Sequence, residues 1–162
     1  MTTSLVPTTL VPTAVDALDR IDALLDLSAI RFKLAHPEDG DAPTGQQLDT
    51  MEAEYRKFLA LRLAHPDVDI VPCKLVDEMW HRHILDTRAY ADDCELIFGG
   101  FMHHFPYFGL RGEADAQALA EAYADTIERY RTAFGEPPED TWISLDAAAR
   151  CKRTACKPQQ CR

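Results

Sequence analysis

The sequence predicts an all-α protein, a compact bundle of about five helices. Three observations support this fold class. Apolar residues recur at three-to-four spacing along most of the chain, no segment alternates apolar and polar residues as a half-buried strand would, and prolines and glycines fall between the periodic stretches. The length of 162 residues and the hydrophobic fraction of 46% fit a single domain with its own core.

Two helices are predicted in the N-terminal half, the first over 16–34 and the second over 45–64. Each is followed by a His-Pro pair, at 36–37 and 65–66, and proline cannot continue a helix. The segment 36–44 between them contains proline and glycine and is expected to be a loop. The residues expected to face the core are Leu18, Ile21, Leu24, Leu25 and Ala29 in the first helix, and Leu48, Met51, Tyr55, Phe58, Leu59 and Leu63 in the second.

Three further helices are predicted in the rest of the domain. The third covers 72–85, with a proline in its first turn, where the missing N–H costs nothing. The fourth begins after Asp86 or Thr87, either of which can cap a helix, and ends where a glycine- and aromatic-rich loop, 99–112, begins. The fifth is expected over 115–134.

The domain plan is a flexible lead over 1–13, a helical domain over 14–148 and a basic tail over 149–162. The lead has no basic start and is broken by Pro7 and Pro12, so it does not have the pattern of a secretory signal. No apolar run approaches the roughly 18 residues that span a bilayer, so no membrane association is expected. Five cysteines without a signal peptide indicate a reducing, cytoplasmic location.

The charge distribution limits the partners. The net charge of −10 argues against binding to nucleic acid, which needs a basic surface, and favours a basic protein partner. Five of the 17 basic side chains, and no acidic one, lie in 150–162, so the body of the protein is more acidic than the total suggests.

Residues 76–109 hold four of the six histidines, together with many aromatic residues. Imidazole is a common protein ligand for zinc, iron and copper, so the sequence predicts a transition metal ion bound between the 76–85 helix and the 101–108 loop. The candidate metal ligands are His81, His83, His103 and His104.

Helical spacing limits how these histidines can combine. At about 100° per residue, His81 and His83 lie about 200° apart around a helix and do not face one point. His83 shares a stripe with Trp80 and is expected to point toward the core, whereas His81 follows Asp77 by one turn. We therefore expect one ligand from the helix and one from the loop. The alternative is that His83 is a hydrogen-bonded core residue and His81 a solvated one.

Further side chains are expected around the metal, and these are Asp77, Trp80, Tyr90 and Cys94. The Asp77 carboxylate could accept the ring proton of His81 and fix its tautomer. Tyr90 or Cys94 could donate a proton or an electron, although simple core packing is the favoured interpretation of Cys94. The helix dipole is expected to lower the pKa of the Cys73 thiol at the start of its helix.

The tail carries three cysteines with four residues between successive ones: Cys151, Cys156 and Cys161. Lysine and arginine beside them would favour the thiolate form, which is reactive and binds soft ions such as Cu(I). The alternative is a terminus that forms adventitious disulfides.

One segment resembles a known family. Val76-Asp77-Glu78-Met79-Trp80-His81-Arg82-His83, then Tyr90-x2-Asp93-Cys94, then His103-His104-x-Pro106, resembles the glycine-rich domain-containing-protein-like family. The resemblance implies a shared helical unit and little about mechanism. The glycine-rich extension of the plant members is not in this sequence, so the role of that extension does not transfer.

Three functions stay open. The first is a small metal-binding protein, which could be an enzyme acting on a small molecule or peptide by Lewis-acid or oxygen chemistry. The second is a non-catalytic protein-interaction domain whose His/Trp cluster is structural. The third is thiol or copper handling by the cysteine tail. The common enzyme classes are disfavoured, since there is no phosphate loop, serine nucleophile elbow, dinucleotide fingerprint or His-Glu-x2-His motif.

Overall fold

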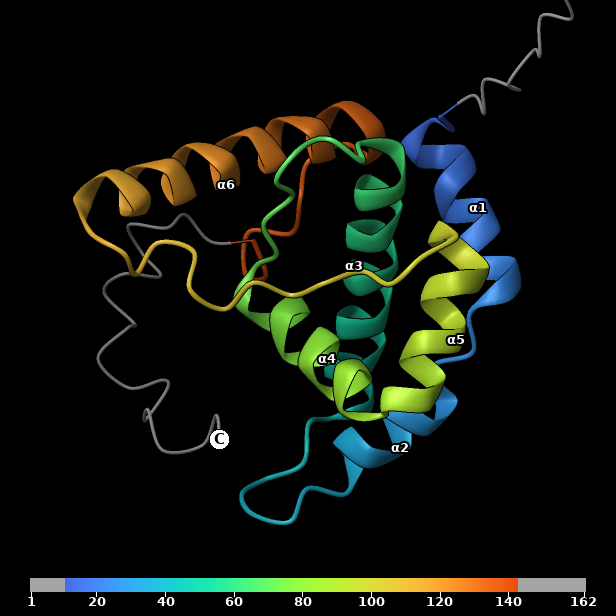
Figure 1. Ribbon diagram of the computed structural model, residues 1–162. Helices are drawn as coiled ribbons and strands as arrows, with labels where there is room; N and C mark the ends of the chain where they lie inside the picture. The colour runs from blue at the N-terminus through green and yellow to red at the C-terminus, as the bar shows by residue number, and fades with distance from the viewer. Residues whose placement is uncertain (1–10, 143–162) are drawn as a thin grey trace, which may run out of the picture.

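The computed structural model describes residues 11–142, and all regular structure in this part of the chain is helical. The helices are α1 (Ala14–Leu24), α2 (Ser28–Ala35), α3 (Gly45–Ala64), α4 (Lys74–Leu85), α5 (Thr87–Phe98) and α6 (Glu113–Phe134). They form a helical bundle (Figure 1), which confirms the predicted fold class, with six helices where about five were expected. None of these helices combines the length and apolar character needed to cross a bilayer.

Helix α3 is the centre of the bundle. Helices α1, α2, α4 and α6 all contact it, and Figure 1 shows them arranged around its axis. Of the core residues predicted on this helix, Leu63 alone is only partly buried. The structure also buries Glu54, Ala60 and Leu61. The prediction of a single apolar face was too narrow, because a helix packed by neighbours on several sides buries several faces.

The single helix predicted over 16–34 is wrong, because the chain leaves the helical path at Leu25–Leu27. The Asp26 carboxylate accepts a hydrogen bond from the backbone N–H of Ser28 at 2.9 Å, a local turn that competes with helix. Leu25 and Leu27, on either side of this turn, are both buried. As a consequence, two predicted core residues of this region, Leu24 and Ala29, are exposed.

The end of α1 is capped by a side chain from α3. The Arg56 guanidinium donates hydrogen bonds to the carbonyl oxygens of Ile21 at 3.3 Å and of Leu25 at 3.0 Å. The Ile21 carbonyl also accepts the backbone N–H of Leu25 at 2.9 Å, so Arg56 adds a second donor there. A cation at this end of the helix also complements the helix dipole. Glu52, one turn before Arg56, pairs with the guanidinium at 2.7 Å and orients it.

A buried carboxylate attaches the C-terminal side of the domain to α3. Glu54 is 3% exposed, and its Oε2 accepts hydrogen bonds from the Tyr130 hydroxyl at 2.8 Å and from the Trp142 indole N–H at 2.7 Å. Lys57 supplies the opposite charge at 2.9 Å from Oε1. A buried charge is tolerated only when it is paired and hydrogen-bonded, so α6 and the turn that ends at Trp142 are required around Glu54.

Helices α4 and α5 meet at Asp86. Its side chain accepts a hydrogen bond from the backbone N–H of Ala89 at 3.5 Å, at one of the two positions predicted for a cap. Helix α4 begins at Lys74, so Pro72 precedes the helix and does not lie in its first turn as predicted.

Local interactions bound the loop 99–112 at both ends. Gly99 has a left-handed φ of 70° and ends α5, as glycine commonly does at this position. In the first turn of α6, the Asp115 carboxylate accepts hydrogen bonds from the backbone N–H groups of Gly109 at 2.7 Å and Arg111 at 3.1 Å. Both ends of the loop are therefore fixed.

We predict that Arg56→Met lowers the free energy of unfolding by about 2 kcal/mol, since it removes charge-assisted hydrogen bonds to two half-buried carbonyls. Urea denaturation followed by circular dichroism measures the change. Arg129→Met is the control, because Arg129 pairs with Asp125 on the surface and its loss should cost about 0.5 kcal/mol or less. Equal effects of the two substitutions would show that Arg56 does not cap α1.

Candidate functional site

The loop 99–112 crosses the face of the bundle in front of α3 and α4 in Figure 1, and a buried hydroxyl holds it there. Trp80 of α4 donates its indole N–H to the Tyr90 hydroxyl of α5 at 2.9 Å. That hydroxyl in turn donates to the carbonyl oxygen of Met102 in the loop. Tyr90 is 1% exposed, and burial raises the pKa of its hydroxyl, which keeps its proton for this bond. The loop is thereby linked to both α4 and α5.

This placement brings His104 of the loop to Asp77 and His81 of α4. The Nε2 of His104 lies 3.2 Å from Oδ1 of Asp77, and the Nδ1 of His81 lies 3.4 Å from Oδ2 of the same carboxylate. The two imidazole rings are 4.5 Å apart between centroids. One ligand atom from each of the three side chains lies within 4.8 Å of the others. The geometry thus joins one histidine of the helix and one of the loop on a single carboxylate.

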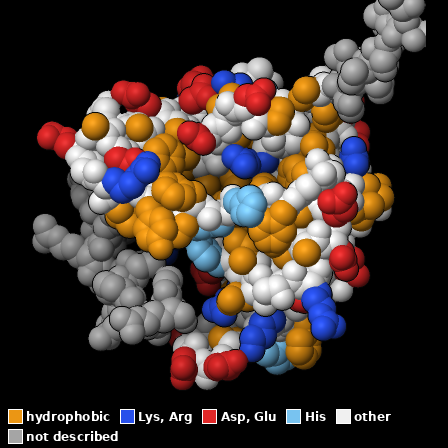
Figure 2. All heavy atoms as spheres, viewed as in Figure 1, with side chains coloured by type: hydrophobic (Ala, Val, Ile, Leu, Met, Phe, Trp, Pro, Cys, Tyr) orange, Lys and Arg blue, Asp and Glu red, His pale blue; other side chains and the backbone are white. Residues whose placement is uncertain are grey.

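The three side chains differ in exposure. His104 is the most enclosed, with 18% of its side chain exposed, and its ring meets the Trp80 ring edge-on at 4.6 Å. Asp77 and His81 are 38% and 47% exposed. Figure 2 shows histidine and hydrophobic side chains gathered near the middle of this face, with most acidic side chains toward its edge. The triad formed by Asp77, His81 and His104 is therefore covered by Trp80 on one side and open to solvent on the other.

Hydrogen bonding determines which nitrogens are available. The Nδ1 of His81 lies 2.6 Å from the backbone carbonyl oxygen of Asp77, which can only accept, so Nδ1 carries the proton. The lone pair is then on Nε2 of His81, a common arrangement for histidine ligands of metals. Two imidazoles and one carboxylate can hold zinc in an open catalytic-type site, or iron(II) with free coordination positions.

His83 is separated from this triad. It is 2% exposed and lies among α3, α4 and α5, as the helical spacing predicted. The Tyr55 hydroxyl is 3.0 Å from its Nδ1, and its Nε2 is 2.9 Å from Oδ2 of Asp93. One tautomer satisfies both bonds, with Nδ1 accepting from Tyr55 and Nε2–H donating to Asp93. Burial lowers the pKa of the His83 imidazole, and Asp93 only partly offsets this effect. Both ring nitrogens are hydrogen-bonded within the core, so His83 has a structural role.

The remaining predicted residues also lie outside the triad. His103 is exposed, and its ring lies tilted against that of Phe101, with centroids 5.0 Å apart. Cys94 is 2% exposed under the loop, and burial raises the pKa of its thiol. The Tyr90 hydroxyl is bonded to Trp80 and Met102, and the role that these bonds show is to hold the loop.

The expectation for Cys73 is wrong. Its thiol is 3% exposed, and burial raises its pKa to about 11, in spite of the backbone N–H groups at the start of α4 that lower it. Desolvation of the thiolate outweighs the helix dipole here, because the side chain points into the core and not toward solvent. The predicted thiol tail, Cys151, Cys156 and Cys161, lies outside the described residues.

Comparison with protein families identifies the family of this chain. A family model described as UCP032817-like matches residues 31–127, more than half of the chain. The chain belongs to the UCP032817-like family. This match overturns the resemblance to the glycine-rich domain-containing-protein-like family, which rested on a short segment and not on the length of the domain.

The matched region contains the whole triad, α3 to α5 and the loop 99–112. The triad therefore lies within the matched region. The description of this family names no activity. No curated protein matches the chain, and no solved structure matches it.

Sequence reasoning missed the partners of His83, although a signal was available. Asp93 lies on the same helical stripe as Tyr90, Cys94 and Ile97, three buried residues. A carboxylate on an apolar stripe indicates a buried polar partner, since an unpaired one would be costly. The partner itself, ten residues away in α4, is not apparent before the helices are packed.

We predict that Tyr90→Phe lowers the free energy of unfolding by about 2 kcal/mol, since it leaves the Trp80 N–H and the Met102 carbonyl without their partner. It should also speed amide hydrogen exchange across 100–108, because the loop loses its attachment. Tyr107→Phe is the control, as Tyr107 is 60% exposed. Unchanged exchange in the loop of Tyr90→Phe would contradict this role.

The buried His83 predicts a pH dependence of stability. In the unfolded chain His83 takes up a proton as the pH falls through about 6.5, whereas in the fold burial lowers its pKa in spite of Asp93 and Asp86. The unfolded state then binds more protons, so the free energy of unfolding falls as the pH drops below about 6.5.

This dependence should be weaker in His83→Gln and retained in His36→Gln, which removes an exposed histidine at the end of α2. Urea denaturation at several pH values between about 5.5 and about 7.5, on either side of the ordinary histidine pKa, measures it. Equal pH slopes for His83→Gln and the wild type would mean that His83 is not the group responsible.

Proposed function

We propose that this protein binds a divalent transition metal ion through Asp77, His81 and His104. The observation that carries the proposal is the convergence of one ligand atom from each residue within 4.8 Å of the others. Two of these residues come from one turn of α4, and the third is brought from a loop 23 positions further along the chain by the Trp80–Tyr90–Met102 hydrogen bonds. Such a loop attachment supports a site that exists before the ion arrives.

The ligand set favours zinc or iron(II) over other ions. Calcium and magnesium prefer oxygen ligands, whereas imidazole suits zinc, iron and copper. No thiol lies in the triad, and both described cysteines, Cys73 and Cys94, are buried in the core. Three protein ligands also leave a coordination position for water or a substrate atom.

The surroundings of the triad favour a reactive site over a purely structural one. A structural zinc site is closed by four protein ligands, but here His81 and Asp77 are 47% and 38% exposed. A small molecule could approach from this open side, while Trp80 covers the other. The chemistry proposed is therefore Lewis-acid activation of a small ligand, which a zinc or iron ion supplies when bound.

Metal binding is tested with the full chain purified without a histidine tag. Zinc titration by calorimetry should give one site of stoichiometry close to one per chain in addition to any binding by the cysteine tail. His104→Ala and Asp77→Asn should each weaken that site by at least about tenfold, because each loses a ligand or its orienting partner.

His103→Ala is the matched control, since it removes the adjacent histidine without touching the triad. Cobalt substitution separates the two kinds of site, because thiolate ligands give a sulfur-to-cobalt charge-transfer band and a site of two imidazoles and one carboxylate does not. Equal zinc affinity in His104→Ala, His103→Ala and the wild type would sink the proposal.

The same loop favours a second candidate function, a protein-interaction domain. Four large apolar side chains are more than half exposed along it, at 52% for Phe101, 53% for Phe105, 60% for Tyr107 and 71% for Leu110. Exposed aromatic groups of this kind mark contact surfaces. In that case the triad would serve only as a hydrogen-bonded anchor for the loop, and the zinc titration would show no site that depends on His104.

A further inference from the structure

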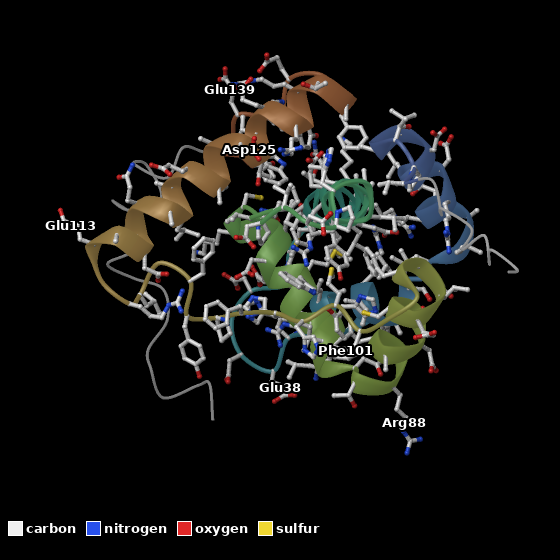
Figure 3. The ribbon with its side chains drawn as sticks, turned by 45° about the horizontal axis from the view of Figure 1, so that its top comes forward. Glu38, Arg88, Phe101, Glu113, Asp125 and Glu139 are labelled. Atoms are coloured by element: carbon white, nitrogen blue, oxygen red, sulfur yellow. The ribbon has the colours of Figure 1, made fainter. Side chains whose placement is uncertain are left out.

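A cleft of about 300 Å³ lies where α3 ends and the loop 99–112 begins. Its walls are Arg62 and Leu63 from the last turn of α3, Pro66 from the next segment, Phe98 from α5 and the loop residues 100–102. Figure 3 labels Phe101 on this loop. Apart from Arg62, every side chain that lines the cleft is apolar.

Arg62 is the unusual member of this cleft. Its Nε is buried and has no hydrogen-bond partner, the one such side-chain atom among residues 11–142. No ion pair within 4.0 Å involves its guanidinium in that part of the chain either. Asp69, the carboxylate whose charge acts on Arg62 most strongly, is itself exposed to solvent.

Arg62 occupies a position on α3 where an apolar residue would be expected. Tyr55, Phe58 and Leu59 are buried, and Arg62 continues the same stripe at the seventh residue after Tyr55. An apolar residue would fit this stripe without leaving a polar atom unpaired. Elsewhere in α3 the charged side chains that approach the core, Arg56 and Glu54, have all their principal partners within the protein. A partner for Arg62 is therefore missing from the part of the chain that the structure describes.

We infer that this cleft binds a small organic carboxylate whose body is aromatic or branched and apolar. The guanidinium presents a planar fork of donors that matches a carboxylate with two parallel hydrogen bonds. The rings of Phe98 and Phe101, with Met102, Leu63 and Pro66, suit the apolar part of such a ligand. Gly100 contributes backbone alone to the wall, so the ligand can approach the chain closely there.

This carboxylate site is independent of the proposed metal site, although both use the loop 99–112. The cleft is lined by residues 100–102 of the loop, and the triad uses residue 104. No residue belongs to both sites. Failure of one proposal therefore leaves the other standing.

The test is titration of the full chain, labelled with nitrogen-15, with sodium phenylacetate, followed by amide chemical shifts. The expected result is saturable binding with the largest shifts at Leu63 and at residues 100–102. Phenylacetamide, which lacks the charge, and acetate, which lacks the apolar body, should each bind at least about tenfold more weakly.

Substitution of the arginine completes the test. Arg62→Met should raise the dissociation constant for phenylacetate at least about tenfold, and Arg62→Lys, which keeps the charge but not the fork, should raise it less. Arg88→Met is the charge-matched control, since Figure 3 shows the labelled Arg88 extending from α5 into solvent, away from the cleft. It should leave the constant within about twofold of the wild type.

Several outcomes would overturn the inference. They are no saturable binding of phenylacetate, shifts that map away from the cleft, equal binding of phenylacetamide, equal binding of acetate, or equal losses in Arg62→Met and Arg88→Met. Circular dichroism and the melting temperature establish that each variant is folded. If Arg62→Met does not fold, the comparison of Arg62→Lys with the wild type and with Arg88→Met decides, because a ligand that needs the fork must still lose affinity in Arg62→Lys.

Discussion

The Tyr90 hydroxyl is the interaction on which both candidate sites depend. It accepts from the Trp80 indole and donates to the Met102 carbonyl, so one buried oxygen joins α4, α5 and the loop 99–112. His104 reaches the triad from that loop, and Phe101 and Met102 form part of the cleft. A loop with exposed backbone and no secondary structure of its own would otherwise sample many positions, and neither site would be defined.

Helix α4 shows how two histidines only two residues apart have unrelated roles. A rotation of about 200° sends His83 into the core and His81 to the surface. In the core, both nitrogens of His83 are bonded, to Tyr55 and Asp93, and desolvation keeps the ring neutral. At the surface, His81 has one nitrogen bonded to a carbonyl and the other available. Burial and hydrogen bonding, more than residue type, separate the structural histidine from the candidate ligand.

The charged side chains of α3 that approach the core also differ, in whether they have partners within the protein. Glu54 has three donors around its carboxylate, and these contacts bring in α6 and the turn at Trp142. Arg56 donates to the carbonyls that end α1 and so closes the bundle on another side. Arg62 lies on the same helix in similar surroundings without such partners among the described residues. Satisfied charges account for the architecture, and the unsatisfied one indicates a ligand that completes it.

The sequence by itself determined the local structure: the helical class, the end of α5 at Gly99 and the separation of His81 from His83. These depend on capping, glycine geometry and helical period, which act over a few residues. Only the tertiary structure decided that His104 rather than His103 meets Asp77, 27 residues earlier. Adjacent side chains in a loop diverge, and the choice between them follows from how the loop is held against Trp80 and Tyr90. That interaction links segments that are distant in sequence, so no local pattern encodes it.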